Sequence, residues 1–105
     1  MRRCQRRDHV GIHHDLADAL DYYRREAPEQ IGRLADLYLK RVRLIELRPF
    51  AHPLLFEDYR HVVLKPFNFM VVYTVEETTI DVLALLHARR DPEWIEHKVR
   101  GRTFS

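Results

Sequence analysis

Apolar residues recur at helical spacing near the start of the chain. Between Asp15 and Arg25 they lie at Leu16, Ala19, Leu20 and Tyr23. This i, i+3, i+4, i+7 pattern indicates one face of a helix. Asp15 and Asp18 suit its N-terminal turn, because the helix dipole stabilises carboxylates there.

A second and longer helical pattern begins at Pro28, a residue that fits a first helical turn. Its apolar face continues as far as Pro49 through Ile31, Leu34, Ala35, Tyr38, Val42 and Ile45. A helix of this extent would have ~20 residues and a length of ~30 Å. Because so few residues separate the two helices, we expect an antiparallel helical hairpin.

Three runs rich in β-branched and aromatic residues follow at 60–64, 67–75 and 80–87. Their connections are short, which favours an antiparallel meander. In the middle run, alternation places one set of residues on the core face: Phe67, Phe69, Val71, Tyr73 and Val75. In the last run it groups Ile80, Val82, Ala84 and Leu86 opposite Asp81, Leu83, Leu85 and His87. Both faces of that strand are apolar, so we expect the second face to meet another surface.

The segments around these elements give weaker patterns. Residues 49–59 suggest a partly buried connector, and Asp91-Pro92-Glu93-Trp94 predict an N-capped short helix. From Arg100 onward we expect a frayed tail. Residues 1–14 are left open: a short strand is one option, but residues 2–8 are nearly all polar and poor in strand formers. The expected fold is α+β, with a helical hairpin packed on an antiparallel three- to four-stranded sheet and a short C-terminal helix, in one domain over residues 15–105.

Composition narrows the class of protein. A chain of 105 residues with 46% hydrophobic and 32% charged residues has the size and balance of one folded domain. Its apolar runs are far shorter than the ~20 residues of a membrane-spanning helix, and the first residues lack a secretory signal pattern. Its single cysteine, Cys4, fits a reducing compartment. We therefore expect a cytoplasmic protein that does not associate with membranes.

The net charge of +2 is unevenly distributed, with the basic excess at the two ends and an acidic stretch in the later middle. Most of the 18 basic residues are arginines. Arginine makes planar bidentate contacts with carboxylates and phosphates, so an acidic protein or a nucleic acid is one interpretation of the pattern. A solvated basic surface without a partner is the other.

Several short segments together resemble the RelE/ParE family of type II toxins. They are Asp15-Leu16-Ala17-Asp18-Ala19-Leu20-Asp21-Tyr22-Tyr23, Ala27-Pro28-Glu29, Tyr59-Arg60, Phe67-Asn68-Phe69, Val72-Tyr73 and His87-Ala88-Arg89-Arg90-Asp91-Pro92. The resemblance implies a strand before the first helix and a toxin neutralised by a cognate antitoxin, a segment of which lies along apolar grooves. Members similar to RelE cut messenger RNA on the ribosome, whereas members similar to ParE inhibit DNA gyrase.

The residues at the positions where the family's nucleases carry catalytic groups help to distinguish messenger RNA from DNA gyrase as the target. Where the resemblance implies basic nuclease residues and a late tyrosine, this chain has His61, Val63, Met70 and Ile95, and only Arg89 is retained. A substitute nuclease site would use Arg60, His61, His87 and Arg89, with Lys65 nearby, because RNA cleavage without a metal needs proton-transfer groups and cations.

Each candidate also has a purely structural interpretation. Arg60 could pair with Glu57 or Asp58, and His61 could be a core-edge histidine beside Val63. His87 could hydrogen-bond the turn that follows it. Arg89-Arg90-Asp91 could be a charge pair at the start of a helix, and two arginines beyond a sheet edge also suit recognition of an anion.

Other chemistries have little support. His9 and His13 have the spacing of a helical metal pair but no third ligand nearby, and Cys4 at a chain end has no base to activate it. We expect no metal or cofactor.

The leading hypothesis is a ParE-like toxin that acts by binding DNA gyrase. Its target-binding residues would be Arg60, His87, Arg89, Arg90 and Trp94, and its antitoxin would cover Leu83 and Leu85. The alternatives are a ribosome-dependent mRNA endonuclease and a degenerate toxin retained as an antitoxin-binding partner.

Overall fold

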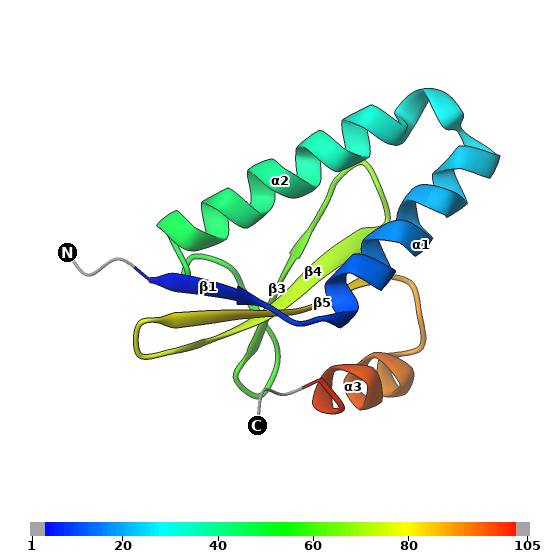
Figure 1. Cartoon of the computed structure of the whole chain (residues 1–105). Coiled ribbons are helices and arrows are strands. Elements are labelled where there is room, and N and C mark those ends of the chain that lie inside the picture. The colour runs from blue at the N-terminus through cyan, green and yellow to red at the C-terminus, as the bar shows by residue number, and fades with distance from the viewer. Residues whose placement is uncertain (1–3, 103–105) are drawn as a thin grey trace.

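A mixed five-stranded sheet in the order β1-β5-β4-β3-β2 forms the middle of the molecule (Figure 1). The structure is a computed structural model that describes residues 4–102. Its elements are β1 (Gln5–Asp8), α1 (Gly11–Glu26), a 3₁₀ turn η1 (Pro28–Gln30), α2 (Ile31–Leu47), β2 (Leu54–Phe56), β3 (Tyr59–Val63), β4 (Phe69–Glu76), β5 (Thr79–His87) and α3 (Pro92–Arg100). The expected α+β fold, with a helical hairpin on a meander and a short C-terminal helix, is confirmed.

The helical hairpin of α1 and α2 packs on one face of the sheet. The predicted stripe of α2 is its buried side, with Leu34, Tyr38, Val42 and Ile45 each at most 6% exposed. They meet the predicted face of β4, where Val71 and Tyr73 are fully buried. Burying each such side chain contributes about 1.5–3 kcal/mol, so this apolar layer holds the hairpin on the sheet.

Strand β1 forms in the segment that the sequence left open, and it runs parallel to β5. All four of its residues are exposed, which explains why no apolar alternation marks it. Backbone hydrogen bonds hold it instead: the amide of Gln5 donates to the carbonyl of Thr78 at 2.7 Å, and a second bond joins His9 to Val82 at 2.8 Å. Arg7 adds a 2.7 Å ion pair to Asp81 on β5. The sheet therefore has one strand more than the longest meander we expected, and that strand is parallel.

A β-bulge in β5 overturns the predicted alternation of that strand. Val72 pairs with Ala84 whereas Tyr73 pairs with Val82, so Leu83 is an extra residue. One extra residue reverses which face the following side chains point to. Ile80, Val82 and Leu85 consequently face the hairpin, while Leu83, Ala84 and Leu86 face the other side of the sheet. The prediction that residues 80, 82, 84 and 86 share a face is wrong beyond the bulge.

The second apolar face is covered by α3. Ile95 and Val99 of this helix pack with Leu83, Leu86 and Met70. The expectation that the second face meets another surface is confirmed, and that surface belongs to the same chain. The described residues contain no helix with the length and apolar character needed to cross a membrane.

Candidate functional site

Three of the predicted target-binding residues come together where β5 ends. His87, Arg90 and Trp94 line a hollow of about 290 Å³ between α1 and α3. His14 and Asp18 of α1 form its opposite wall, and Lys98 of α3 adds another cation. We call His87, Arg90, Trp94 and Lys98, together with the adjacent Arg89, the basic end.

The ring of His87 is held by the turn that follows it, as one interpretation of the sequence predicted. The backbone amide of Arg89 donates to Nδ1 of His87 at 3.2 Å. A neutral ring that accepts at Nδ1 carries its proton on Nε2, so it offers a donor with its other nitrogen. The ring also lies edge-to-face with Phe69, at 5.2 Å between centroids. In this tautomer the Nε2 proton of His87 is available to donate a hydrogen bond.

Arg90 and Trp94 form a stacked pair across the first turn of α3. The guanidinium carbon of Arg90 lies 3.8 Å from the centroid of the indole ring, and the ammonium of Lys98 lies 5.9 Å from it. Cation–π contacts of this kind hold arginine in one orientation without neutralising its charge. The neighbouring Arg89 is exposed, and within residues 4–102 its side chain has no ion-pair partner. Both arginines therefore keep their charge available at the basic end.

Arg60 lies elsewhere. It is in register with Tyr73 on β4, whereas His87 is in register with Phe69. Four residues of strand separate these positions, or roughly 13 Å. Its guanidinium donates to the carbonyl of His52 at 2.7 Å, and Glu57 pairs with Arg100 instead, at 2.6 Å. The expected ion pair between Arg60 and Glu57 or Asp58 is therefore wrong.

His61 faces the opposite side of the sheet from Arg60 and His87. It lines a groove beside α3 with Val63 and Met70, as expected of a core-edge histidine. Its Nδ1 is buried and has no hydrogen-bond partner among the described residues. Strand β4 also separates His61 from β5. The two histidines lie on opposite faces, two strand spacings or about 10 Å apart across the sheet, and three residues or about 10 Å apart along the strands, since His61 pairs with Val72 and His87 with Phe69. The residues of the substitute nuclease site are therefore not assembled around one point.

The two residues expected to contact an antitoxin are covered by this chain. Leu83 is 1% exposed and lies under α3, and Leu85 is 2% exposed and lies in the hairpin core. The reason is the bulge, which directs the two leucines to different faces, each with its own helical cover. A partner could reach neither of them without displacing a helix.

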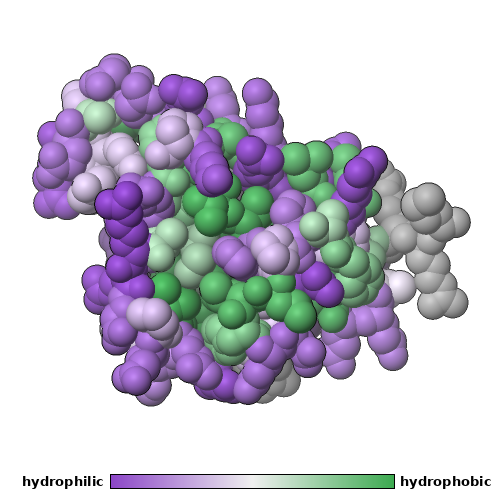
Figure 2. Space-filling view, turned by 180° about the vertical axis from the view of Figure 1, so that it is seen from behind, coloured by the Kyte–Doolittle hydropathy of each residue, from purple (hydrophilic) through white to green (hydrophobic). Residues whose placement is uncertain are grey.

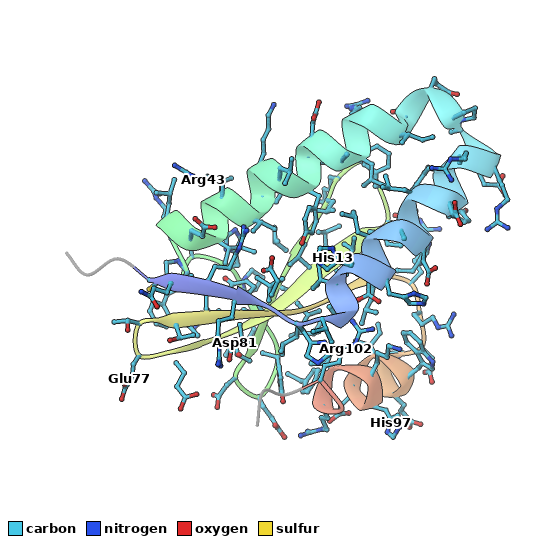
Figure 3. All side chains as sticks on the ribbon, in the orientation of Figure 1. His13, Arg43, Glu77, Asp81, His97 and Arg102 are labelled. Atoms are coloured by element: carbon cyan, nitrogen blue, oxygen red, sulfur yellow. The ribbon has the colours of Figure 1, made fainter. Side chains whose placement is uncertain are left out.

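Sequence reasoning missed a buried ion pair between Asp15 and Arg102, which are 7% and 8% exposed. The two terminal guanidinium nitrogens of Arg102, Nη1 and Nη2, donate to the Asp15 carboxylate, and Nη1 also donates to the carbonyl of Leu83 at 3.2 Å. The carboxylate accepts a further bond from the amide of Leu85 at 3.0 Å. Figure 3 shows Arg102 between the start of α1 and the end of α3.

This arrangement corrects the expected frayed tail as far as Arg102. The pair satisfies the carbonyl of the bulged Leu83 and the amide of Leu85, and it joins α1, β5 and the end of α3. Gly11 leaves room for it, because a Cβ there would lie 2.6 Å from the guanidinium carbon of Arg102. No local pattern connects residues 11, 15 and 102, so the sequence carries no readable signal for the contact.

Comparison with known proteins gives consistent matches. Residues 12–92 match the model of the family described as ParE toxin of type II toxin-antitoxin system, parDE. The chain is 40% identical over 99 residues to Toxin ParE2 from two strains of Mycobacterium tuberculosis, covering 93% of this chain and 94% of the relative. A solved structure from P. aeruginosa, titled as its chromosomal ParDE TA system, superposes with a TM-score of 0.71 at 16% identity. That alignment covers 82% of this chain and 97% of the other, and it shows a shared fold.

Proposed function

Since the chain belongs to the ParE toxin family of type II toxin–antitoxin systems, we propose that it inhibits growth by binding DNA gyrase and that a cognate antitoxin neutralises it. The observation that carries the gyrase proposal is the contrast between two sets of residues. Of the four groups of the substitute nuclease site, Arg60 and His61 lie apart from His87 and Arg89, and His61 lies on the other face of the sheet. The residues of the basic end, in contrast, lie together and are accessible. That contrast favours a toxin that binds over one that cleaves.

The basic end fits an acidic surface of a target protein. Arg89 and Arg90 provide planar donors, and the Nε2 proton of His87 provides another beside the hollow. Carboxylates pair well with such donors, particularly where an aromatic ring already orients the cation. We therefore place the gyrase contact on His87, Arg89, Arg90 and Trp94 and leave Arg60 out of it.

The antitoxin needs a surface other than Leu83 and Leu85. Helix α2 offers Leu39 and Leu44, which are 63% and 41% exposed. Figure 3 shows Arg43 pointing away from the sheet on the same helix. We propose that an antitoxin segment covers this outer side of the hairpin, where about 800 Å² of toxin surface would make a stable complex.

The first test is inhibition of gyrase supercoiling by the purified toxin, with DNA cleavage scored in the same reactions. We expect inhibition near equal concentrations, and loss of most of it in the Arg89→Ala/Arg90→Ala variant. The matched control is Arg25→Ala/Arg33→Ala, which removes two exposed arginines from the helical hairpin. If the folded wild type leaves gyrase unaffected and cleaves messenger RNA on ribosomes, the endonuclease alternative replaces our proposal. If it does neither and fails to arrest growth, the degenerate-toxin alternative replaces it.

A further inference from the structure

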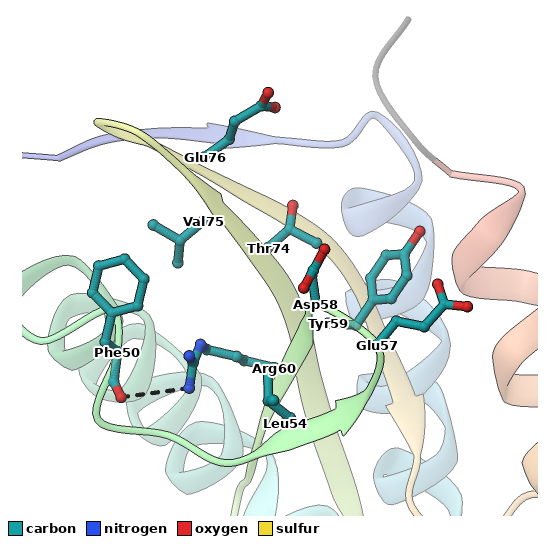
Figure 4. A pocket seen from close by; sticks show the side chains of 9 residues that line it. All are labelled: Phe50, Leu54, Glu57, Asp58, Tyr59, Arg60, Thr74, Val75 and Glu76. Carbon is teal, nitrogen blue, oxygen red and sulfur yellow. Dashed lines mark hydrogen bonds between the residues drawn. The ribbon is translucent and has the colours of Figure 1, made fainter.

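The connector after α2 holds one aromatic ring in solvent. Phe50 is 63% exposed, yet the backbone on both sides of it is fixed. The hydroxyl of the buried Tyr73 donates to the carbonyl of Pro49 at 2.7 Å and lies 3.1 Å from Nδ1 of His52. Arg60 donates to the carbonyl of His52 at 2.7 Å. It also donates to the carbonyl of Phe50 at 3.4 Å, the bond drawn in Figure 4. The exposure of Phe50 is therefore built into the fold and does not come from a loose loop.

Two other exposed apolar side chains line hollows that Phe50 also lines. Leu47 at the end of α2 is 64% exposed, and Leu54 at the start of the edge strand β2 is 54% exposed. Phe50 lines a hollow of about 620 Å³ with Leu47 and a second hollow of about 510 Å³ with Leu54. Figure 2, which views the molecule from behind Figure 1, shows apolar surface between polar margins on that face. We call Leu47, Phe50 and Leu54 the Phe50 strip.

Carboxylates line the margin of the Phe50 strip. Asp58 and Glu76 line the hollow shared with Leu54, and Glu77 lines the hollow shared with Leu47. None of the three forms an ion pair with a residue in the described part of the chain. Two other carboxylates nearby are already paired, since Glu46 binds Arg6 and Glu57 binds Arg100. The guanidinium of Arg60 in the same hollow is bound to carbonyls and lies 5.3 Å from the Phe50 ring.

The hairpin turns bring these carboxylates to one end of the sheet. Because β3 and β4 are antiparallel, the β2–β3 turn and the β4–β5 turn lie at the same end. Glu57 and Glu77 in these turns have φ values of 46° and 53°, a region that favours glycine or asparagine. The chain therefore has glutamates where a turn alone would prefer other residues. The cations of the basic end lie beyond the opposite end of the same strands.

We propose that the Phe50 strip is a docking surface for a basic amphipathic segment of a partner protein, one that presents two apolar side chains flanked by lysine or arginine. The apolar side chains would cover Phe50 and its two leucines, and the cations would face Asp58, Glu76 and Glu77. A second copy of this chain in a symmetric contact would bring like carboxylates together, and nucleic acid would meet the same repulsion. Opposite charge at the two ends of the sheet lets this partner bind independently of the target at the basic end.

Fluorescence anisotropy with a designed probe tests the proposal. The probe is a fluorescein-labelled peptide of three Leu-Arg-Arg-Leu repeats, and the control probe has glutamate in place of arginine. We expect the basic probe to bind the wild-type protein, to bind at least tenfold more weakly to Phe50→Asp and to Glu76→Lys/Glu77→Lys, and to weaken as salt is raised. Val10→Asp is the matched control, because it places the same charge on an exposed apolar residue, 83% accessible, that belongs to none of the proposed binding surfaces.

Several outcomes would overturn the proposal. One is that the basic probe fails to bind the folded protein. Another is that the acidic probe binds equally well. A third is that Phe50→Asp and Val10→Asp reduce binding of the basic probe to the same extent. A wild-type dimer in light scattering that Phe50→Asp converts to a monomer would assign the strip to a second copy. Gyrase inhibition by the Phe50→Asp variant is measured in parallel. Because Phe50 is not part of the basic end, that assay reports failure of the gyrase proposal separately.

Discussion

Replacing Arg102 by Met should cause a large loss of stability for a residue so close to the end of the chain. The substitution keeps most of the side-chain volume. It leaves the Asp15 carboxylate, which is 7% exposed, with the amide of Leu85 as its one hydrogen-bond partner among residues 4–102. Removing one member of a buried ion pair costs about 3–5 kcal/mol. The carbonyl of Leu83 also loses its bond from Arg102, which adds about 1 kcal/mol. We therefore expect the free energy of unfolding to fall by at least ~3 kcal/mol.

Urea denaturation followed by circular dichroism measures this loss. For a domain of this size the unfolding free energy changes by ~1.5 kcal/mol per molar urea, so the midpoint should fall by ~2 M. Arg100→Met is the matched control, because Arg100 is two residues away and forms only exposed ion pairs. Its midpoint should change little.

A double-mutant cycle separates the ion pair from other effects of the substitution. Asp15→Asn keeps an acceptor for the amide of Leu85 while removing the charge. The double variant Asp15→Asn/Arg102→Met should be much more stable than the sum of the two single losses predicts, with a coupling above about 1 kcal/mol. If the two losses add, or if Arg102→Met behaves like Arg100→Met, the pair does not clamp the bulge and our reasoning about the C-terminal end is wrong.

Two further predictions concern the same fold. Gly11→Ala should lower the melting temperature, because its Cβ would lie 2.6 Å from the guanidinium carbon of Arg102. Gly32→Ala should raise the melting temperature, because its Cβ would face open space in α2 and alanine favours a helix over glycine. The opposite order of melting temperatures would contradict the packing described here. Burial raises the pKa of Tyr38 and of Tyr73 to about 12 from an ordinary 10. A raised pKa in the folded state means that the stability from the neutral phenols is complete below pH 10 and is lost as the pH rises from 10 towards 12. Urea midpoints across that range should fall less steeply for Tyr38→Phe/Tyr73→Phe than for the wild type, and equal slopes would refute the assignment.

The sequence by itself determined the elements that bury a regular apolar face. The 3.6-residue period of α2 and the two-residue period of β4 each indicate which side chains face the core, because the spacing of apolar residues within one element is enough to show its buried face. The turn contact of His87 could also be predicted, since it involves a neighbour two residues away. Resemblance in short ordered segments was enough to indicate the toxin family, which the 40% identity to Toxin ParE2 supports over most of the chain.

Tertiary structure alone decided the features that depend on distant partners. Strand β1 has four exposed residues, and its pairing with β5 comes from backbone hydrogen bonds that leave no mark in the side-chain pattern. The bulge at Leu83 redirects Leu85, and Asp15 and Arg102 satisfy the backbone groups around it across 87 residues of sequence. Strand register likewise separates Arg60 from His87 and gathers the carboxylates beside Phe50. Local periodicity predicts which face a side chain occupies, but register and long-range hydrogen bonding determine which side chains meet.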